Sequence, residues 1–311
     1  MSQETVFVAL QTFCEGTDQP RQDLLQAGFR LQENPLGRRL QREELPELLR
    51  EADAVLAGVE PYDGELLTML TSLRCISRCG VGTDNIDLET ARRKGVAVLT
   101  TAEEVVEPVV QLTLAMILSL ARNLPLHWND FRRGEWRKYT GHLLSEWTVG
   151  LVGFGKIGKA LYDTLRPFGC RILVYDPHVT QKGIPKGVGC TQLEPLLRES
   201  DVVSLHAALP MGSPPLLGKR EFALMRKGSR LINTSRGRLV DEEALVEALE
   251  SKQLSAAALD VFENEPYTGR LSRLPQVLCT PHVASLTVRS RVEMELRCAR
   301  NVIEFFSKRG R

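Results

Sequence analysis

The stretch Trp147-Thr-Val-Gly-Leu-Val-Gly-Phe-Gly-Lys-Ile-Gly158 decides the fold of this 311-residue chain. It places the pattern G-x-G-x-x-G between an apolar run that predicts a strand and a helical run; the glycines are Gly153, Gly155 and Gly158. In such a pattern the first glycine allows a tight turn, the second lets the backbone approach a pyrophosphate, and the third lets helix pack closely on strand. The helix N-terminus offers N–H groups and positive potential to the pyrophosphate. The stretch therefore predicts a dinucleotide site, to which we also assign Lys156 and Ile157.

An acidic residue completes this pattern. Asp176 follows Gly158 by 18 residues, at the end of a second apolar run, Ile172–Tyr175. A carboxylate at this place accepts hydrogen bonds from the adenosine ribose hydroxyls and repels a 2′-phosphate. A turn without a ligand explains many G-x-G-x-x-G patterns, but strand, helix and acid together favour the cofactor. We predict NAD rather than NADP.

Length and composition describe an ordinary globular chain of about two domains. The hydrophobic content is 43%, the charged content 25% and the net charge +1, which argues against a nucleic-acid partner bound by bulk electrostatics. The local basic run of Arg132, Arg133, Arg137 and Lys138 is interpreted as a solvated surface segment. We assign no metal ligands.

Cysteine usage and hydropathy favour a soluble, cytoplasmic protein without a membrane segment. The 7 cysteines are odd in number and scattered, with no C-x-x-C pair, which is typical of reduced thiols in a reducing compartment. The N-terminal apolar run, Thr5–Leu10, is too short for a signal peptide. The longest nearly uncharged stretch, Pro108–Ala121, is too short to cross a bilayer and predicts a buried helix instead.

Strand and helix signals alternate along the whole chain, which predicts parallel sheets with helices on both faces. Before the glycine pattern, the signals are an apolar strand at 6–10, helices at 24–27 and 42–52, a strand at 54–57, a helix at 63–73, a strand at 74–78, a helix capped by Asp87 and a strand at 96–99. A buried helix at 112–120 bridges the two halves.

The second half contains six expected strands, enough for a complete doubly wound sheet. They are expected at 149–152, 172–175, 202–206, 230–233, 256–259 and 277–279, with helices at 156–165, 193–199, 220–225, 242–250 and about 287–307. The last helix has no strand to follow, so we expect it to pack on the first domain.

Three of these strands end in residues suited to catalysis. The fourth leads into Asn233-Thr-Ser-Arg236-Gly, the fifth into Leu259-Asp-Val-Phe and Glu263-Asn-Glu265-Pro, and the sixth into Thr280-Pro-His282. Because the carboxyl ends of parallel strands meet at one rim, we expect Arg236, Glu265 and His282 to lie together.

These three residue types form a catalytic set. Arginine holds a carboxylate bidentately, and histidine is the usual general acid or base near neutral pH. A carboxylate beside the histidine fixes its tautomer and raises its pKa. Singly, Arg236, Glu265 and His282 have ordinary explanations as a turn arginine, a loop acid and a capping residue. Their positions at successive strand ends favour a shared site, and Thr234 of the same motif is assigned to the cofactor.

With these motifs the chain resembles the D-isomer-specific 2-hydroxyacid dehydrogenase family, which includes D-3-phosphoglycerate dehydrogenase. The resemblance extends from about Ala54 to Ser307 and is most specific in the glycine pattern, the three strand ends and Cys79-Gly-Val-Gly-Thr-Asp-Asn-Ile-Asp87. It implies that Arg236, Glu265 and His282 are catalytic. It also implies that Asp260 contacts the nicotinamide amide and that the backbone of Val81 and Gly82 helps hold the substrate carboxylate.

The resemblance also implies the fold and the assembly. The fold class is α/β, with two doubly wound parallel-sheet domains: a Rossmann NAD-binding domain at 101–285, and a smaller flavodoxin-like substrate-binding domain at 1–100 plus 286–311. The implied substrate is a small 2-hydroxy or 2-oxo acid, and the implied assembly is a homodimer.

Several residues depart from the family pattern around the substrate. Glu60 stands where phosphoglycerate dehydrogenases carry a basic phosphate-binding residue, and Glu104 makes a second loop acidic. Gln111 replaces a usual glutamate, and Ala284-Ser285 replaces a common glycine pair. The chain ends at Arg311, which leaves no room for a C-terminal regulatory domain. We therefore expect an altered pocket that disfavours 3-phosphoglycerate.

Two other functions fit the same motifs. One is an NADH-sensing corepressor-like binding protein, in which dehydrogenase chemistry is secondary. The other is a formate- or phosphite-type dehydrogenase, in which a one-centre substrate replaces the hydroxy acid.

Overall fold

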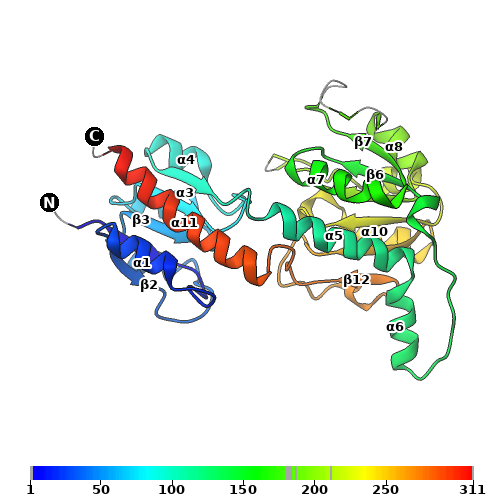
Figure 1. Ribbon diagram of the computed structural model, residues 1–311, viewed down its shortest axis with the longest axis horizontal. Helices are drawn as coiled ribbons and strands as arrows, with labels where there is room; N and C mark the ends of the chain where they lie inside the picture. The colour runs from blue at the N-terminus through cyan, green and yellow to red at the C-terminus, as the bar shows by residue number, and fades with distance from the viewer. Residues whose placement is uncertain (1–2, 180–183, 186–187, 211, 310–311) are drawn as a thin grey trace. The chain divides into compact units, whose positions relative to one another are not determined.

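The computed structural model describes residues 3–179, 184–185, 188–210 and 212–309. The chain divides into two compact units, one formed by Met1–Val105 with Ser285–Arg311 and the other by Val106–Ala284. Each unit contains its own sheet, and the strand pairs of the described chain are all parallel (Figure 1). The chain is thus an α/β protein with two parallel sheets, as the alternating pattern predicts.

The first unit has a five-stranded sheet in the order β2-β1-β3-β4-β5. The strands are β1 (Thr5–Val8), β2 (Arg30–Glu33), β3 (Ala54–Ala57), β4 (Cys75–Arg78) and β5 (Ala97–Thr100). The helices are α1 (Gln19–Gln26), α2 (Leu45–Leu48), α3 (Gly64–Met69), α4 (Leu88–Arg93) and α11 (Val288–Arg309). The C-terminal helix α11 packs on β4 and α1, which confirms that the last helix returns to the first sheet (Figure 1).

The second unit has a seven-stranded sheet in the order β12-β11-β10-β9-β6-β7-β8. The strands are β6 (Thr148–Val152), β7 (Arg171–Tyr175), β8 (Gly189–Cys190), β9 (Val202–Leu205), β10 (Ser229–Asn233), β11 (Leu254–Leu259) and β12 (Val277–Cys279). The helices are α5 (Val106–Ala121), α6 (Leu124–Arg132), α7 (Lys156–Leu165), α8 (Leu193–Glu199), α9 (Lys219–Leu224) and α10 (Glu242–Glu250).

Apolar cores on both faces bury this second sheet. One core joins Val149 and Leu151 of β6 to α5 and α7, and the other joins Val203 and Leu205 of β9 to α8, α9 and α10. The chain order reverses between β6 and β9, and ligands bind at such a switch point in open parallel sheets.

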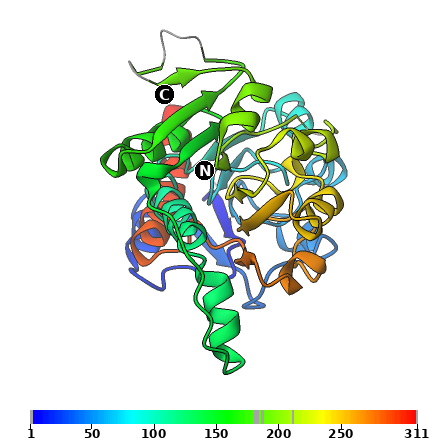
Figure 2. The same ribbon diagram turned by 90° about the vertical axis from the view of Figure 1, so that its right-hand side faces the viewer.

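Five predictions about elements are wrong or incomplete. The sheet has a seventh strand, the two-residue edge strand β8, and the first sheet has the unpredicted edge strand β2, whose sequence Arg-Leu-Gln-Glu has no apolar alternation. The helix expected at 42–52 is reduced to the single turn of α2, and the one at 24–27 begins at Gln19. Helix α6 was not predicted; it follows α5 at a bend of 68° and projects from the second unit (Figure 2). Pairing with a neighbouring strand, rather than local pattern, decides the two edge strands.

No single helix of the described chain is long and apolar enough to cross a membrane. Helices α5 and α6 meet the requirement only as a bent pair, by length and composition.

Candidate active site

The glycine turn after β6 has the form that a dinucleotide needs. Gly153 has φ +98°, and a Cβ there would lie 2.4 Å from the carbonyl oxygen of His206 at the end of β9. A Cβ on Gly158 would lie 2.2 Å from the Gly153 oxygen, so the third glycine is required by the packing of α7 on the turn. A Cβ on Gly155 would meet no atom of the described residues within 4 Å. Protein packing thus explains the first and third glycines, and open space for a ligand explains the second.

The start of α7 presents backbone N–H groups to that space. Gly155 is the N-cap and has no side chain to occupy the first turn, and both Gly155 and Lys156 are exposed. The partial positive charge of this helix end favours a pyrophosphate. Asp176, at the end of β7, accepts hydrogen bonds from the N–H groups of Phe154 at 2.7 Å and His178 at 2.8 Å. The turn itself therefore holds this carboxylate next to the glycines, and the residues present fit NAD.

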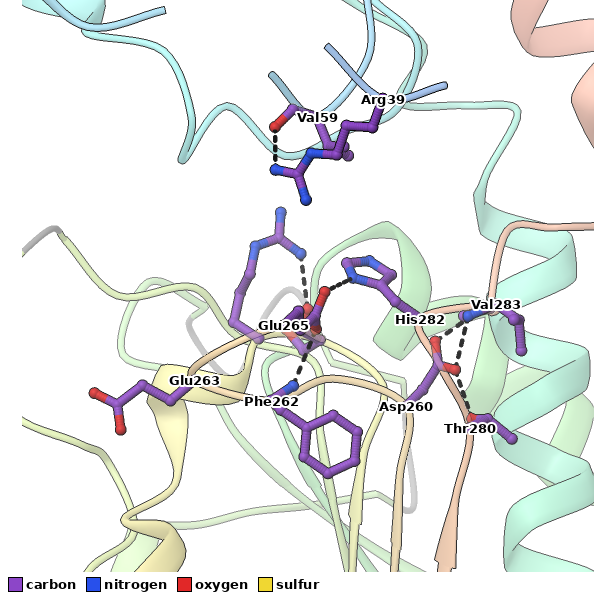
Figure 3. A network of polar contacts seen from close by, with 12 residues as sticks. Arg39, Val59, Asp260, Phe262, Glu263, Glu265, Thr280, His282 and Val283 are labelled. Carbon is purple, nitrogen blue, oxygen red and sulfur yellow. Dashed lines mark hydrogen bonds and ion pairs between the residues drawn. The ribbon is translucent and has the colours of Figure 1, made fainter. Parts of the chain in front are cut away.

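The three residues predicted from the strand ends do come together. His282 Nδ1 lies 2.8 Å from Glu265 Oε2, while the other oxygen of Glu265 accepts a hydrogen bond from the Phe262 N–H at 3.0 Å (Figure 3). The positive charge of Arg236 reaches both groups: it helps to keep Glu265 ionised, and it opposes in part the rise in the pKa of His282 that the Glu265 hydrogen bond causes. The rim of one sheet thus brings an arginine, a carboxylate and an imidazole into one site.

The electrostatics of this site favour a protonated histidine beside an ionised glutamate. The hydrogen bond to Glu265 is the main cause that raises the pKa of His282, against the opposing effect of burial. Burial raises the pKa of Glu265, but the hydrogen bonds from His282 and Phe262 outweigh it and leave that pKa lowered. The His282 side chain is 50% exposed, so it can reach a substrate. An imidazole in this setting can donate a proton, and it can accept one in the reverse reaction.

Asp260 holds the segment that carries His282. Its side chain is 0% exposed and accepts three hydrogen bonds: from Thr280 Oγ1 at 2.5 Å, from Val283 N at 2.8 Å and from Ala284 N at 2.9 Å (Figure 3). His282 itself has φ +54°, a conformation that L-residues rarely adopt and that needs support from the surrounding structure. Asp260 is therefore a positioning residue. Its contact with the nicotinamide stays a prediction.

Two residues that position Arg236 were quoted in the sequence motif but given no role. Asn233 is 1% exposed, donates to the Arg236 carbonyl at 2.8 Å and accepts from the Ser235 N–H at 3.1 Å. A Cβ on Gly237 would lie 1.8 Å from the backbone carbon of Phe262, so only glycine lets the β10 loop touch the β11 loop. An asparagine at a strand end, with a glycine four residues later, is the signal that could have revealed this turn.

The Thr234 side chain, predicted to bind the cofactor, contacts another side chain of the protein in this structure. Its hydroxyl lies 2.8 Å from the Thr113 hydroxyl of α5, which in turn donates to the Val109 carbonyl at 2.7 Å. The Thr234 side chain therefore ties β10 to α5. Binding of the cofactor by Thr234, Lys156 and Ile157 stays a prediction.

Val81 and Gly82 belong to the first unit, in the loop after β4. Val81 is 42% exposed, and the loop is anchored by Gly80, which exchanges hydrogen bonds with Thr101 (2.8 Å from Gly80 N to Oγ1 and 3.1 Å from Thr101 N to the Gly80 oxygen). Their binding to a substrate carboxylate stays a prediction.

The structure corrects the argument made from Glu60. This residue is only 2% exposed, and its carboxylate accepts a hydrogen bond from the Gly58 N–H at 2.8 Å inside its own loop. Burial raises its pKa. Glu60 shapes the loop after β3 and is not a pocket charge that faces a phosphate. Among the described residues, no group of three or more His, Cys, Asp or Glu side chains could hold a metal ion.

Comparisons with known proteins place this geometry in context. Residues 114–284 match the family model described as D-isomer specific 2-hydroxyacid dehydrogenase, NAD binding domain. The chain is 37% identical over 273 residues to a glyoxylate reductase of Thermococcus litoralis, covering 84% of this chain and 82% of that protein. It is 34% identical over 266 residues to a hydroxypyruvate reductase of Thermotoga maritima, covering 83% and 86%. It also resembles the crystal structure of D-lactate dehydrogenase from Aquifex aeolicus complexed with NAD and lactic acid, at 26% identity and a TM-score of 0.86, covering 98% and 96%.

Proposed function

The chain belongs to the D-isomer specific 2-hydroxyacid dehydrogenase family, and we propose from this premise that it reduces small 2-oxo acids such as glyoxylate or hydroxypyruvate. Membership makes it an NAD-dependent oxidoreductase. The observation that carries the proposed mechanism is the His282–Glu265 pair beside Arg236 at the ends of β10, β11 and β12.

In the proposed mechanism each residue of this group has one task. The bound cofactor would supply a hydride to C2 of the 2-oxo acid in its reduced form, NADH, and would accept one from C2 of the 2-hydroxy acid in its oxidised form, NAD⁺. The guanidinium of Arg236 holds the substrate carboxylate and stabilises negative charge that develops on the carbonyl oxygen. His282 donates a proton from Nε2 to that oxygen, because its Nδ1 is engaged with Glu265. In oxidation the same nitrogen accepts the hydroxyl proton.

Replacing the histidine tests this mechanism. We expect His282→Ala to lower turnover with glyoxylate or hydroxypyruvate by about 10²- to 10⁴-fold, the usual contribution of a general acid–base, while NADH still binds. A matched control is His142→Ala, because His142 also pairs with a glutamate, Glu146, at 3.0 Å, but both side chains lie on the surface, 47% and 53% exposed. That control should keep its turnover. Parental turnover in both variants would exclude His282 from the mechanism.

A substrate panel followed at 340 nm separates the alternatives. Oxidation of NADH by several 2-oxo acids supports the proposal. Turnover of formate or phosphite alone would indicate the one-centre dehydrogenase instead. Tight NADH binding without turnover of any candidate would indicate the sensor.

We also propose the homodimer that the family resemblance implies. Helix α6 and the segment after it expose large apolar side chains, with Trp128 63%, Phe131 63% and Trp136 82% exposed. Exposed apolar clusters of this kind are typical of protein interfaces. We expect light scattering to give twice the chain mass and Trp128→Glu with Phe131→Glu to give a monomer. A monomeric parent chain would refute the dimer.

The cytoplasmic location is proposed on the cysteines. Each of the seven lies in the described part of the chain and is a free thiol. Cell fractionation that recovers the chain from an oxidising compartment would contradict this location.

A further inference from the structure

Two thiols of the first unit meet where α11 covers β4. Cys79 directly follows β4, and Cys298 lies on α11. The Cys298 thiol lies 3.7 Å from the Ser77 carbonyl, and the Asn301 amide, one helical turn further, donates to the Ser77 hydroxyl at 3.3 Å. Cys298 is 0% exposed and Cys79 is 7% exposed. Cys298 is therefore fully enclosed in the core, and Cys79 lies at the edge of the core.

A fixed guanidinium lies against the more accessible thiol. Nη1 of Arg291 donates to Cys79 Sγ at 3.8 Å. Nη2 of the same side chain donates to Glu295 Oε1 at 2.6 Å and to the Thr12 carbonyl at 2.9 Å. Glu295 and Thr12 thus hold the Arg291 guanidinium in place, with its Nη1 directed to the Cys79 sulfur.

This arrangement separates the two thiols chemically. A hydrogen bond from Cys298 is the first cause that lowers the pKa of Cys79; Arg291 and Arg78 add to it, against burial and the charge of Glu295. Burial raises the pKa of Cys298 well above its ordinary value. The single hydrogen of Cys298 can turn from the Ser77 carbonyl to the Cys79 sulfur when that sulfur is ionised. Of the two thiols, Cys79 is therefore the more acidic one and the one that forms the nucleophilic thiolate more readily.

We propose that Cys79 and Cys298 are a reversible oxidation site that closes a disulfide on exposure to a hydroperoxide. The Cys79 thiolate attacks the peroxide, the O–O bond breaks, and Cys79 becomes a sulfenic acid with release of water or an alcohol. The Cys298 thiol then attacks the Cys79 sulfur, the S–O bond breaks, and the hydroxyl group leaves as water with the proton of the Cys298 thiol. Two thiols are oxidised by two electrons, and one peroxide is reduced.

The disulfide would act on the loop that Cys79 begins. The next residue, Gly80, anchors that loop through Thr101, and the loop continues into Val81 and Gly82. Cross-linking ties the start of this loop to α11 and removes the negative charge of the thiolate that Arg291 contacts. We expect the oxidised protein to show a raised KM for its 2-oxo acid and a dithiol to restore the original value. The cross-link itself is independent of the substrate.

Peptide mapping of the full chain tests the proposal. The protein is treated with hydrogen peroxide, alkylated with iodoacetamide, digested without reduction and analysed by mass spectrometry. We expect the peptide of Cys79 linked to that of Cys298, and loss of the link after dithiothreitol. Both peptides alkylated, or Cys79 linked instead to Cys14, would overturn the proposal.

Variants assign the two roles. Cys298→Ser should abolish the link and leave Cys79 as a sulfenic acid that dimedone labels. Cys170→Ser, a half-buried thiol of the second unit, is the matched control and should retain the link. In a Cys79→Ser chain, Cys298 should not be labelled by dimedone. Labelling of Cys298 there as fast as that of Cys79 in the Cys298→Ser chain would refute Cys79 as the attacking thiol. If Cys298→Ser does not fold, Cys298→Ala and the wild-type peptide map still decide.

Discussion

Asp260→Asn is the substitution that distinguishes positioning of His282 from contact with the cofactor. The carboxylate accepts hydrogen bonds on both oxygens, from Thr280 and Val283 on one and from Ala284 on the other. An asparagine has one oxygen and one NH2 group, so in either orientation of the amide one backbone N–H loses its acceptor. The Thr280 hydroxyl can turn to accept, but an N–H cannot.

The energetic cost follows from these contacts. A buried N–H without an acceptor costs about 1–3 kcal/mol, and each of the two remaining bonds weakens by about 1 kcal/mol when its charged acceptor becomes neutral. A neutral amide is easier to bury than a carboxylate, which offsets part of this sum. We expect a net loss of about 2–4 kcal/mol in the unfolding free energy. For a unit of this size, that lowers the melting temperature by about 5–15 °C.

Tryptophan fluorescence measures this loss selectively. All three tryptophans, Trp128, Trp136 and Trp147, lie in the second unit, and Trp147 is only 4% exposed, so its emission reports unfolding there. The control is Asp241→Asn, because Asp241 caps α10 through the Ala244 N–H, and asparagine is an equally good N-cap. We expect that control to stay within about 0.5 kcal/mol of the parent.

Kinetics complete the test. A displacement of His282 by about 1 Å can lower kcat about 10²-fold, with little change in NADH affinity. The reasoning fails if Asp260→Asn keeps the parental melting temperature and kcat but binds NADH about tenfold more weakly. That result would mean that the carboxylate acts on the cofactor and does not position the histidine.

Three further substitutions test the rest of the site. Glu265→Gln removes the negative charge that raises the pKa of His282. In the reductive direction, activity falls as pH rises through that pKa, so the falling limb of the kcat/KM profile should move to lower pH in this variant. A falling limb at the parental pH would contradict the pairing of the two residues. Gly155→Ala should leave the melting temperature unchanged and weaken NADH binding in titration calorimetry. Gly158→Ala should lower the melting temperature, because its Cβ would lie 2.2 Å from the Gly153 oxygen. Equal effects of the two substitutions on melting temperature and NADH binding would refute the distinct roles of the two glycines. Asp176→Ser should raise turnover with NADPH relative to NADH, and an unchanged ratio would exclude selection through charge repulsion by this carboxylate.

Much of the fold is local and was therefore predictable. Helices α7, α8 and α10 and strand β12 lie at the predicted residues, because their apolar periodicity and their end residues agree with their final packing. The edge strand β2 was missed because its polar sequence forms a strand only by pairing with β1. Helix α6 was missed because its apolar residues are left exposed, so its sequence lacks the contrast between a buried and a solvated face.

The site shows the same division. The rule that parallel strands end at one rim was enough to bring Arg236, Glu265 and His282 together from three distant motifs. It could not reveal that Asp260 uses both oxygens on the protein, because those partners come from the next strand end. Nor could it show that Glu60 turns into its own loop, since a charged residue after a strand is more often solvated.

The sequence alone determined the cofactor class and most of the succession of elements, and it predicted which three side chains lie together at the rim, because glycine spacing, periodicity and residue chemistry are properties of short segments. Only the tertiary structure decided the hydrogen bonds that give these side chains their protonation states and orientations, and the contact of Cys79 with Cys298 and Arg291 across more than 200 residues of chain. Such contacts depend on which residues of distant segments face one another in the packed core, which no local pattern encodes.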